Sequence, residues 1–253
     1  MTHRPEARKL FLAGATGAIG KRLVPLLVKR GWQVFGTTRS ADKAKLLAAA
    51  GVEPVVLDVF DAQAVMDAVT DARPAVIVHQ LTDLPHGGNP AQFAEAVPRN
   101  ARIRKEGTAH LVAAALAADV PLMVAQSIAW AYAPQARAFR EEDPLDVRAD
   151  GTRGISVGGV AELERRVLQS SPLRGVVLRY GHLYGPGTGA ERGSAPPAVH
   201  VDAAAWAAVL AIEHGEAGVY NIAEPAEQLD TSKARIKLDW SAAWRAAHSW
   251  NRC

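Results

Sequence analysis

The segment KLFLAGATGAIGKRLVPLL, residues 9–27, constrains the fold more than any other part of the chain. A short apolar run precedes Gly14, Gly17 and Gly20, which are spaced three residues apart, and a helical pattern follows them. In such a turn the first glycine permits the tight bend, the second lets the backbone approach a pyrophosphate, and the third lets the helix pack near the strand. Amides at the start of the helix would hold the phosphates. The segment predicts a dinucleotide-binding unit, and an ordinary strand-to-helix turn is the alternative.

Short apolar runs alternate with helical periodicity along most of the chain, which is typical of a parallel sheet with helices on both faces. The predicted strands are 9–13, 33–37, 54–57, 75–80, 121–125, 176–179 and 218–222. The predicted helices are 19–29, 41–50, 62–70, 99–118, 156–169 and 201–213. The expected fold is therefore α/β, a Rossmann-type doubly wound parallel sheet.

The pattern divides the chain near Tyr180. Residues 1–180 are expected to form the dinucleotide-binding Rossmann domain, which the strand at 218–222 rejoins. Glycine and proline crowd together after Tyr180, so residues 181–253 predict a small, shortened C-terminal cap that binds substrate, followed by a tail. In the tail, Trp240 and Trp244 lie four residues apart, a spacing that favours a docking helix.

Composition excludes several classes of protein. The chain has 253 residues, 49% of them hydrophobic, and 29 basic residues against 26 acidic ones give a net charge of +3 without long runs of one sign. A nucleic-acid partner is therefore not expected. A single cysteine, Cys253, excludes an internal disulfide and predicts a cytoplasmic protein. The polar start and the short apolar runs predict neither export nor a membrane span.

The end of the second strand decides the choice of cofactor. An acidic side chain there would bind the 2′-hydroxyl of NAD, whereas this chain has Thr38, Arg39 and Ser40, whose hydroxyls and guanidinium suit a 2′-phosphate. NADP(H) is therefore the preferred cofactor and NAD(H) the alternative, with Arg39 then only a solvated surface charge. Asp58 is placed to accept a hydrogen bond from the adenine amino group, or else to cap the helix that begins near Ala62.

A series of motifs resembles the extended and atypical short-chain dehydrogenases/reductases, the NAD-dependent epimerase/dehydratase group. GATGAIG, VVLDVFD, VIVHQLT, RKEGTAHLVAAA, VAQSIAWAYAP, VVLRYGHLYGPGT, VHVDAAAWA and VYNIAE follow in that family's order along nearly the whole chain. The resemblance implies a cofactor lying across the carboxyl ends of the strands. It implies that the cofactor is also bound by Thr16, Ala18, Ile19, Val59, Gln80, Leu81, Thr82 and Tyr180.

The resemblance weakens where the family carries its acid–base groups. Its members usually have a Tyr-x-x-x-Lys pair, and alignment on Glu164 places Ser156 and Val160 at those two positions. The assisting Ser/Thr position falls on Ile128, one residue after Ser127, and Arg104 replaces a usual asparagine. The sequence is therefore interpreted as lacking the pair.

Other side chains must then supply a proton. His182 stands where relatives bind substrate and titrates near neutrality, so it is a candidate acid or a loop histidine. Tyr132 is the second candidate, or an aromatic residue that closes the loop, and Ser127 is the third. The remaining candidates are expected to be structural or to lie at the cleft mouth, without metal-ligand spacing: His79, His86, His200 and Asp202.

The leading hypothesis is an NADP(H)-dependent oxidoreductase that acts on a small carbonyl, imine or activated double bond. The alternatives are a redox-silent NADP(H) sensor, an epimerase or dehydratase, and, least in keeping with the phosphate loop, a structural dimerisation protein. The helices predicted at 99–118 and 156–169 correspond to those through which relatives form dimers, so a homodimer is expected.

Overall fold

Seven parallel strands form one sheet in the order β3-β2-β1-β4-β5-β6-β9. The computed structural model describes residues 8–85, 90–193 and 195–246. The strands are β1 (Lys9–Ala13), β2 (Gln33–Thr38), β3 (Glu53–Val56), β4 (Val76–His79), β5 (Leu122–Ile128), β6 (Arg174–Tyr180) and β9 (Gly218–Ile222). This is the Rossmann strand order with one strand added at the β6 edge. The predicted doubly wound α/β fold is confirmed.

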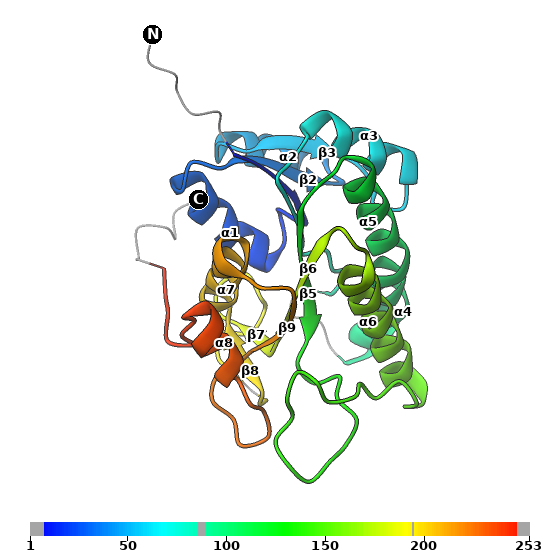
Figure 1. The fold of residues 1–253 in the computed structure, drawn as a ribbon, viewed down its shortest axis with the longest axis vertical. Coiled ribbons are helices and arrows are strands. Elements are labelled where there is room, and N and C mark those ends of the chain that lie inside the picture. The colour runs from blue at the N-terminus through cyan, green and yellow to red at the C-terminus, as the bar shows by residue number, and fades with distance from the viewer. Residues whose placement is uncertain (1–7, 86–89, 194, 247–253) are drawn as a thin grey trace.

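Helices cover both faces of the sheet (Figure 1). One layer contains α1 (Ala18–Lys29), α2 (Ala41–Ala49) and α7 (Val201–His214). The other contains α3 (Ala62–Ala72), α4 (Pro90–Arg102), α5 (Thr108–Ala117) and α6 (Gly151–Gln169). Each face buries its own apolar cluster, because successive strand residues point to opposite sides of the sheet.

Two helices differ from their predicted bounds. The helix expected at 99–118 is the end of a longer helical run that begins at Pro90 and contains a π-helical turn, Ile103–Gly107. The helix expected at 156–169 begins earlier, at Gly151, whose φ of +61° suits glycine. Both differences matter, because the π turn and the start of α6 lie beside the candidate site.

The chain after Tyr180 contributes to the main body as well as to the cap. Helix α7 packs on α1, and β9 pairs with β6 along its whole length. The cap is therefore built from smaller elements: the parallel pair β7 (His182–Tyr184) and β8 (Ala198–His200), the loop that follows β9, and α8 (Ser232–Leu238).

The prediction of a docking helix around Trp240 and Trp244 is wrong. Helix α8 ends at Leu238, and Asp239 adopts a left-handed conformation that stops it. Trp240 is nevertheless buried, and its indole N–H donates to the carbonyl of Ala203 at 2.8 Å. Aromatic packing, rather than helical periodicity, therefore docks this segment.

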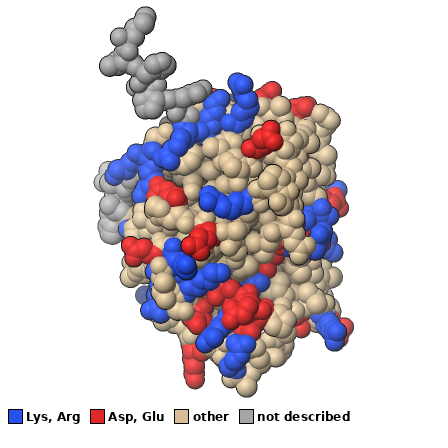
Figure 2. All heavy atoms as spheres, viewed as in Figure 1, with Lys and Arg blue, Asp and Glu red and all other residues tan. Residues whose placement is uncertain are grey.

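The surface carries charges of both signs. On the face drawn in Figure 2, basic and acidic side chains lie interspersed instead of gathering into a field of one sign. Within the described ranges, none of the helices has the length and apolar character that crossing a membrane requires.

Candidate active site

The carboxyl ends of the parallel strands bring the predicted cofactor residues to one edge of the sheet. Along this edge lie Gly14, Thr16, Gly17, Ala18, Ile19 and Gly20 after β1; Thr38, Arg39 and Ser40 at the end of β2; Asp58 and Val59 after β3; Gln80, Leu81 and Thr82 after β4; and Tyr180 at the end of β6. Open α/β sheets bind their ligands outside this edge. The fold thus gathers a set of residues that are far apart in the sequence.

The glycine loop is closed to larger residues. Gly14 has a φ of +95°, and a Cβ atom there would lie 2.7 Å from the backbone carbonyl of Gln80. Gly17 caps α1, and the first turn of that helix, which is fully described, carries no acidic residue. The amides at this helix end can therefore receive an anion without competition from a carboxylate.

Two buried polar side chains near the glycine loop are candidates for hydrogen bonding to a ligand. The side-chain amide of Gln80 and the hydroxyl of Tyr180 have no hydrogen-bond partner within the described part of the chain. They lie near each other but outside hydrogen-bonding geometry, and burial raises the pKa of Tyr180. Buried polar groups are normally satisfied, so a polar ligand is expected here. The loop and these groups fit a nicotinamide dinucleotide.

In the turn after β2, two of the predicted cofactor-binding hydroxyls already accept hydrogen bonds within the protein. The Thr38 hydroxyl accepts from the Ser40 amide at 3.2 Å, and the Ser40 hydroxyl caps α2 by accepting from the Lys43 amide at 3.3 Å. Arg39 has 64% of its side chain exposed and lies 3.7 Å from the carboxylate of Asp83. The guanidinium is thus the most available group of the turn.

The residues after β3 take up separate positions. Asp58 is exposed, and its carboxylate accepts from the Phe60 amide at 3.0 Å. Asp61, not Asp58, caps α3 by accepting from the amide of Ala64. The capping alternative for Asp58 is therefore wrong. Val59 is buried.

On the α6 side of the sheet, the polar groups bind one another. The Ser127 hydroxyl donates to Glu164 at 2.6 Å, and Arg179 binds both carboxylate oxygens of Glu164, at 2.9 and 2.6 Å. All three residues are buried. Ser127 therefore links β5 to α6, and its predicted role in catalysis stays a prediction.

Tyr132 is also engaged. Its hydroxyl donates to the Asn221 side chain at 2.6 Å, and its ring stacks on Phe139 at 5.0 Å between centroids. Burial is the main reason that the pKa of Tyr132 rises to about 12. The Tyr132 phenol is thus 2% exposed and bound within the protein, and its role as a proton donor stays a prediction.

Helix α6 carries Ser156 and Val160, the two positions that the sequence comparison aligned with the family's acid–base pair. Val160 is fully buried. The Ser156 hydroxyl accepts from the guanidinium of Arg104 at 3.1 Å. Arg104 comes from the π-helical turn and is buried, and this burial lowers its pKa to about 10 against the opposing effect of Glu164. The sequence signal was an arginine at a usual asparagine position, but the contact with Ser156 was missed.

A pocket of about 250 Å³ opens at this point, which we call the α6 pocket. It is lined by Val97, Ile128, Trp130, Thr152, Arg153 and Ser156, among others. His182 stacks on Trp130 with ring centroids 4.0 Å apart. Burial lowers the pKa of His182, so the imidazole is neutral at neutral pH and suits hydrogen bonding. His182 thus stays beside a candidate substrate site, and Trp130 is a pocket residue that sequence reasoning missed.

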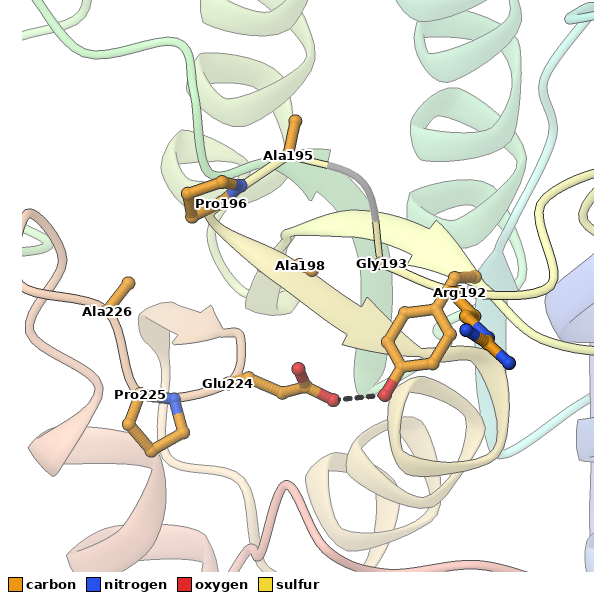
Figure 3. A pocket seen from close by; sticks show the side chains of 9 residues that line it. Arg192, Gly193, Ala195, Pro196, Ala198, Glu224, Pro225 and Ala226 are labelled. Carbon is orange, nitrogen blue, oxygen red and sulfur yellow. Dashed lines mark hydrogen bonds between the residues drawn. The ribbon is translucent and has the colours of Figure 1, made fainter.

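A second pocket, of about 430 Å³, lies in the cap. Figure 3 shows Glu224 among the residues that line it, with a hydrogen bond at its carboxylate; the donor is the Tyr184 hydroxyl, at 2.5 Å. Arg245 also reaches the Tyr184 hydroxyl, at 3.2 Å. Ala198 lines this cap pocket and pairs with His182 in the β7–β8 ribbon. Trp130 thus lines the α6 pocket, while the backbone of its stacking partner His182 pairs with a residue that lines the cap pocket.

The other histidines have structural surroundings. His79 is fully buried, contacts the Thr108 hydroxyl and accepts from the Leu81 amide, and burial lowers its pKa to about 4. His200 caps α7 by accepting from the Asp202 amide. His86 lies outside the described residues. In the described ranges no group of three or more His, Cys, Asp or Glu residues could hold a metal ion.

The fold and this edge define a Rossmann-type dinucleotide-binding protein. Residues 14–204 match the model of the NAD(P)H-binding family. Because the match covers most of the chain, the chain belongs to that family.

Comparison with known proteins adds three likenesses. A 3-diazoavenalumate denitrifying reductase of a Streptomyces species is 44% identical, over 85% of this chain and 76% of that protein. A dTDP-4-dehydrorhamnose reductase of Streptomyces griseus is 30% identical over 74% of this chain, which spans about half (53%) of that relative's length. A UDP-glucose 4-epimerase of Thermotoga maritima, solved with UDP-glucose, shares the fold with a TM-score of 0.74 at 19% identity, over 92% of this chain and 93% of that one.

Proposed function

We propose that this chain is an NADPH-dependent reductase whose substrate accepts a hydride without needing a proton from the protein. The observation that carries the proposal is the state of the residue aligned with the family's lysine and of two candidate proton donors. Val160 is buried, Ser127 is bound to Glu164, and Tyr132 is bound to Asn221. Carbonyl and imine reduction ends with protonation, and groups held in this way supply a proton poorly.

A diazo group meets this requirement. When a carbon-bound diazonium group is replaced by hydrogen, the carbon–nitrogen bond breaks, N₂ leaves with the bonding pair, and one hydride forms the new carbon–hydrogen bond. The reduced nicotinamide supplies that hydride and both electrons, so no proton is consumed. The relative at 44% identity is named for a denitrifying reduction of a diazo compound, which supports the same substrate class for this chain. Epimerisation and dehydration are disfavoured, because both need an active base.

The cofactor preference is proposed from the turn after β2. Arg39 is exposed, and its 3.7 Å contact with Asp83 is long for an ion pair, so the guanidinium can turn toward a 2′-phosphate. Gly14, Gly17 and Gly20 would hold the pyrophosphate, while Gln80 and Tyr180 would meet polar groups of the cofactor.

His182 is proposed to orient the substrate, not to protonate it. Its ring is held by the stack on Trp130, and burial keeps its pKa low. The cap pocket beside Tyr184 and Glu224 offers room for the remainder of a substrate that reaches past the stack.

The experiment is turnover of an arenediazonium salt with NADPH that carries deuterium at the transferred position. We expect N₂ release and one deuterium at the carbon that held nitrogen, measured by mass spectrometry, with no deuterium gained from heavy water. Because NADPH also reduces diazonium salts slowly by itself, a Gly14→Ala variant serves as the matched control. A panel of ketones, imines and enones should react more slowly. Tight NADPH binding without turnover of any of these would favour the redox-silent sensor instead.

A homodimer through α4 and α6 is also proposed. Large apolar side chains are exposed on these helices, with Phe93 40% exposed on α4 and Ile155 45% exposed on α6. Burial of such side chains against a second copy would stabilise a dimer. Light scattering in solution should then give twice the mass of the chain, and a monomer mass at micromolar concentration would contradict this assignment.

A further inference from the structure

The Ser156 hydroxyl in the α6 pocket has a fixed role in its hydrogen bond. Nη1 of Arg104 donates to the Ser156 hydroxyl oxygen at 3.1 Å and to the Ser156 carbonyl at 3.3 Å. A guanidinium has no acceptor, so the hydroxyl oxygen must accept here and its own proton remains for another group. No hydrogen bond from this hydroxyl to a described residue is formed. Because Ser156 lines the pocket, a ligand there is the available acceptor.

The charge of Arg104 is not balanced by a carboxylate of its own. Glu164, the nearest acidic residue that affects it, is already bound by both Arg179 and Ser127. His79 on the other side of Arg104 is neutral, because burial lowers its pKa to about 4. A buried cation without its own counter-ion favours an anionic ligand.

The charged residue that lines the α6 pocket, Arg153, is paired. Arg153 binds Asp146 at 2.7 Å and donates to the carbonyls of Trp130 and Tyr132, at 3.1 and 2.9 Å. It therefore fixes the loop that carries Trp130. Farther out on α4 and the π turn, the remaining ion pairs are Arg99–Asp83 and Arg102–Glu106. Arg104 is thus the buried cation beside the pocket that forms no ion pair with a described residue.

We infer that the α6 pocket binds an anionic oxygen of the substrate, with Ser156 as the hydrogen-bond donor and Arg104 as the residue that positions and polarises it. This inference rests on the proposed function and narrows it. The diazo substrate is an inner salt that carries a phenolate or carboxylate as well as the cationic diazo group, rather than a simple diazonium cation. A cavity of about 150 Å³ accepts benzene, so the pocket of about 250 Å³ has room for one substituted ring beside Trp130.

The test is binding of 4-nitrophenol to the whole chain, saturated with NADP⁺. The absorbance of the nitrophenolate reports its ionisation directly, and the assay needs neither a diazo compound nor turnover. An oxyanion held by Ser156 beside Arg104 should have its apparent pKa lowered by about 1 unit. Competition by benzoate shows whether a carboxylate enters the same site. Three titratable groups adjoin the ligand or its contacts: Arg153 lines the pocket, Arg104 donates to Ser156, and His182 stacks on Trp130. The His182→Gln variant measures the effect of the imidazole by itself.

Matched variants assign the donor. Ser156→Ala should weaken nitrophenolate binding about tenfold and abolish the shift of its pKa. Ser156→Thr keeps a hydroxyl and should retain both, and Arg104→Lys should reduce the shift. Ser170→Ala removes a hydroxyl from the other end of α6, outside the pocket, so it should bind as the unmodified protein does. If Arg104→Lys fails to fold, the comparison of Ser156→Ala with Ser156→Thr still tests whether Ser156 is the hydrogen-bond donor.

Several outcomes separate the two proposals. Binding of neither nitrophenolate nor benzoate, or equal binding by Ser156→Ala and the unmodified chain, would overturn the inference. Equal turnover of a benzenediazonium that carries a phenolate, by Ser156→Ala and by the unmodified chain, would overturn it while the reductase proposal stands. Oxyanion binding that depends on Ser156, in a chain that reduces no diazo compound, would support the site and reject the reductase.

Discussion

Two groups of buried polar residues lie on opposite faces of the same sheet edge, and they differ in whether they have partners. On the α1 face, Gln80 and Tyr180 have no hydrogen-bond partner within the described chain. On the α6 face, the Ser127 hydroxyl and the Arg179 guanidinium both donate hydrogen bonds to the carboxylate of Glu164. A buried polar group without a partner costs stability unless a ligand satisfies it, whereas a satisfied network fixes the structure. The first group therefore belongs to binding and the second to folding.

The largest effect is expected on the α6 face, from Glu164→Ala. The change leaves Arg179 buried without its counter-ion, so the free energy of unfolding should fall by about 3–5 kcal/mol in urea denaturation. Glu162→Ala is the matched control, because Glu162 lies on the same helix and binds Arg165 and Arg166 nearer the surface. It should cost at most about 1 kcal/mol. Similar losses for the two variants would show that the buried network does not hold the fold.

On the α1 face, Gly14→Ala should abolish binding rather than folding. The new methyl group would meet the Gln80 backbone at 2.7 Å, so the phosphate loop must move. We expect NADPH affinity to fall by at least about 100-fold, or about 2.7 kcal/mol, in a calorimetric titration. Gly31→Ala has a similar backbone requirement, with a φ of +76°, but nothing within 4 Å of the new atom. It should cost stability without changing affinity, and an equal loss of affinity would contradict the assignment.

Removing one hydroxyl from each face compares the two groups directly. Tyr132→Phe leaves the Asn221 side chain without its donor, so unfolding free energy should fall by about 1–3 kcal/mol while cofactor affinity is unchanged. Tyr180→Phe removes a hydroxyl that lacks a protein partner, so stability should hold or rise while cofactor affinity falls. Thermal unfolding and NADPH titration of both variants measure this. If Tyr132→Phe lowered cofactor affinity and Tyr180→Phe lowered stability, Tyr132 would belong to cofactor binding and Tyr180 to the stability of the fold.

The two faces also differ in how far the sequence predicted them. The glycine loop was predictable, because Gly14, Gly17 and Gly20 act within one local turn. The partners on the α6 face were not, since Ser127 lies 37 residues from Glu164 and Tyr132 lies 89 residues from Asn221. No local sequence pattern predicts contacts between residues that are so far apart in the chain. The strand alternation of β5 did limit Ser127 to one face, but which helix covers that face depends on the whole topology.

The contact between Arg104 and Ser156 could not be predicted from the sequence either, because it depends on an irregular turn of the helix. A π-helical turn shifts the positions that follow it around the helix, so a regular helical pattern from residue 99 onward places Arg104 in the wrong direction. Similarly, the stack of Trp130 on His182 joins a loop to a cap strand, and neither residue predicts the other. The sequence did mark Ser156 and Arg104 as departures from the family pattern, which is the signal that located this site.

The smallest effect is expected from Arg39→Ala. This variant tests whether cofactor binding on the α1 face involves the exposed Arg39 as well as the buried groups. If Arg39 receives a 2′-phosphate, its loss should weaken NADPH about tenfold and leave NADH unchanged. Fluorescence titration with both cofactors measures the ratio, and the effect should shrink at high salt because the guanidinium is 64% exposed. Lys43→Ala removes the same charge from the neighbouring helix and controls for the general field. Equal losses for NADPH and NADH would mean that Arg39 shapes the turn instead of choosing the cofactor, and the binding face would then end at the buried groups.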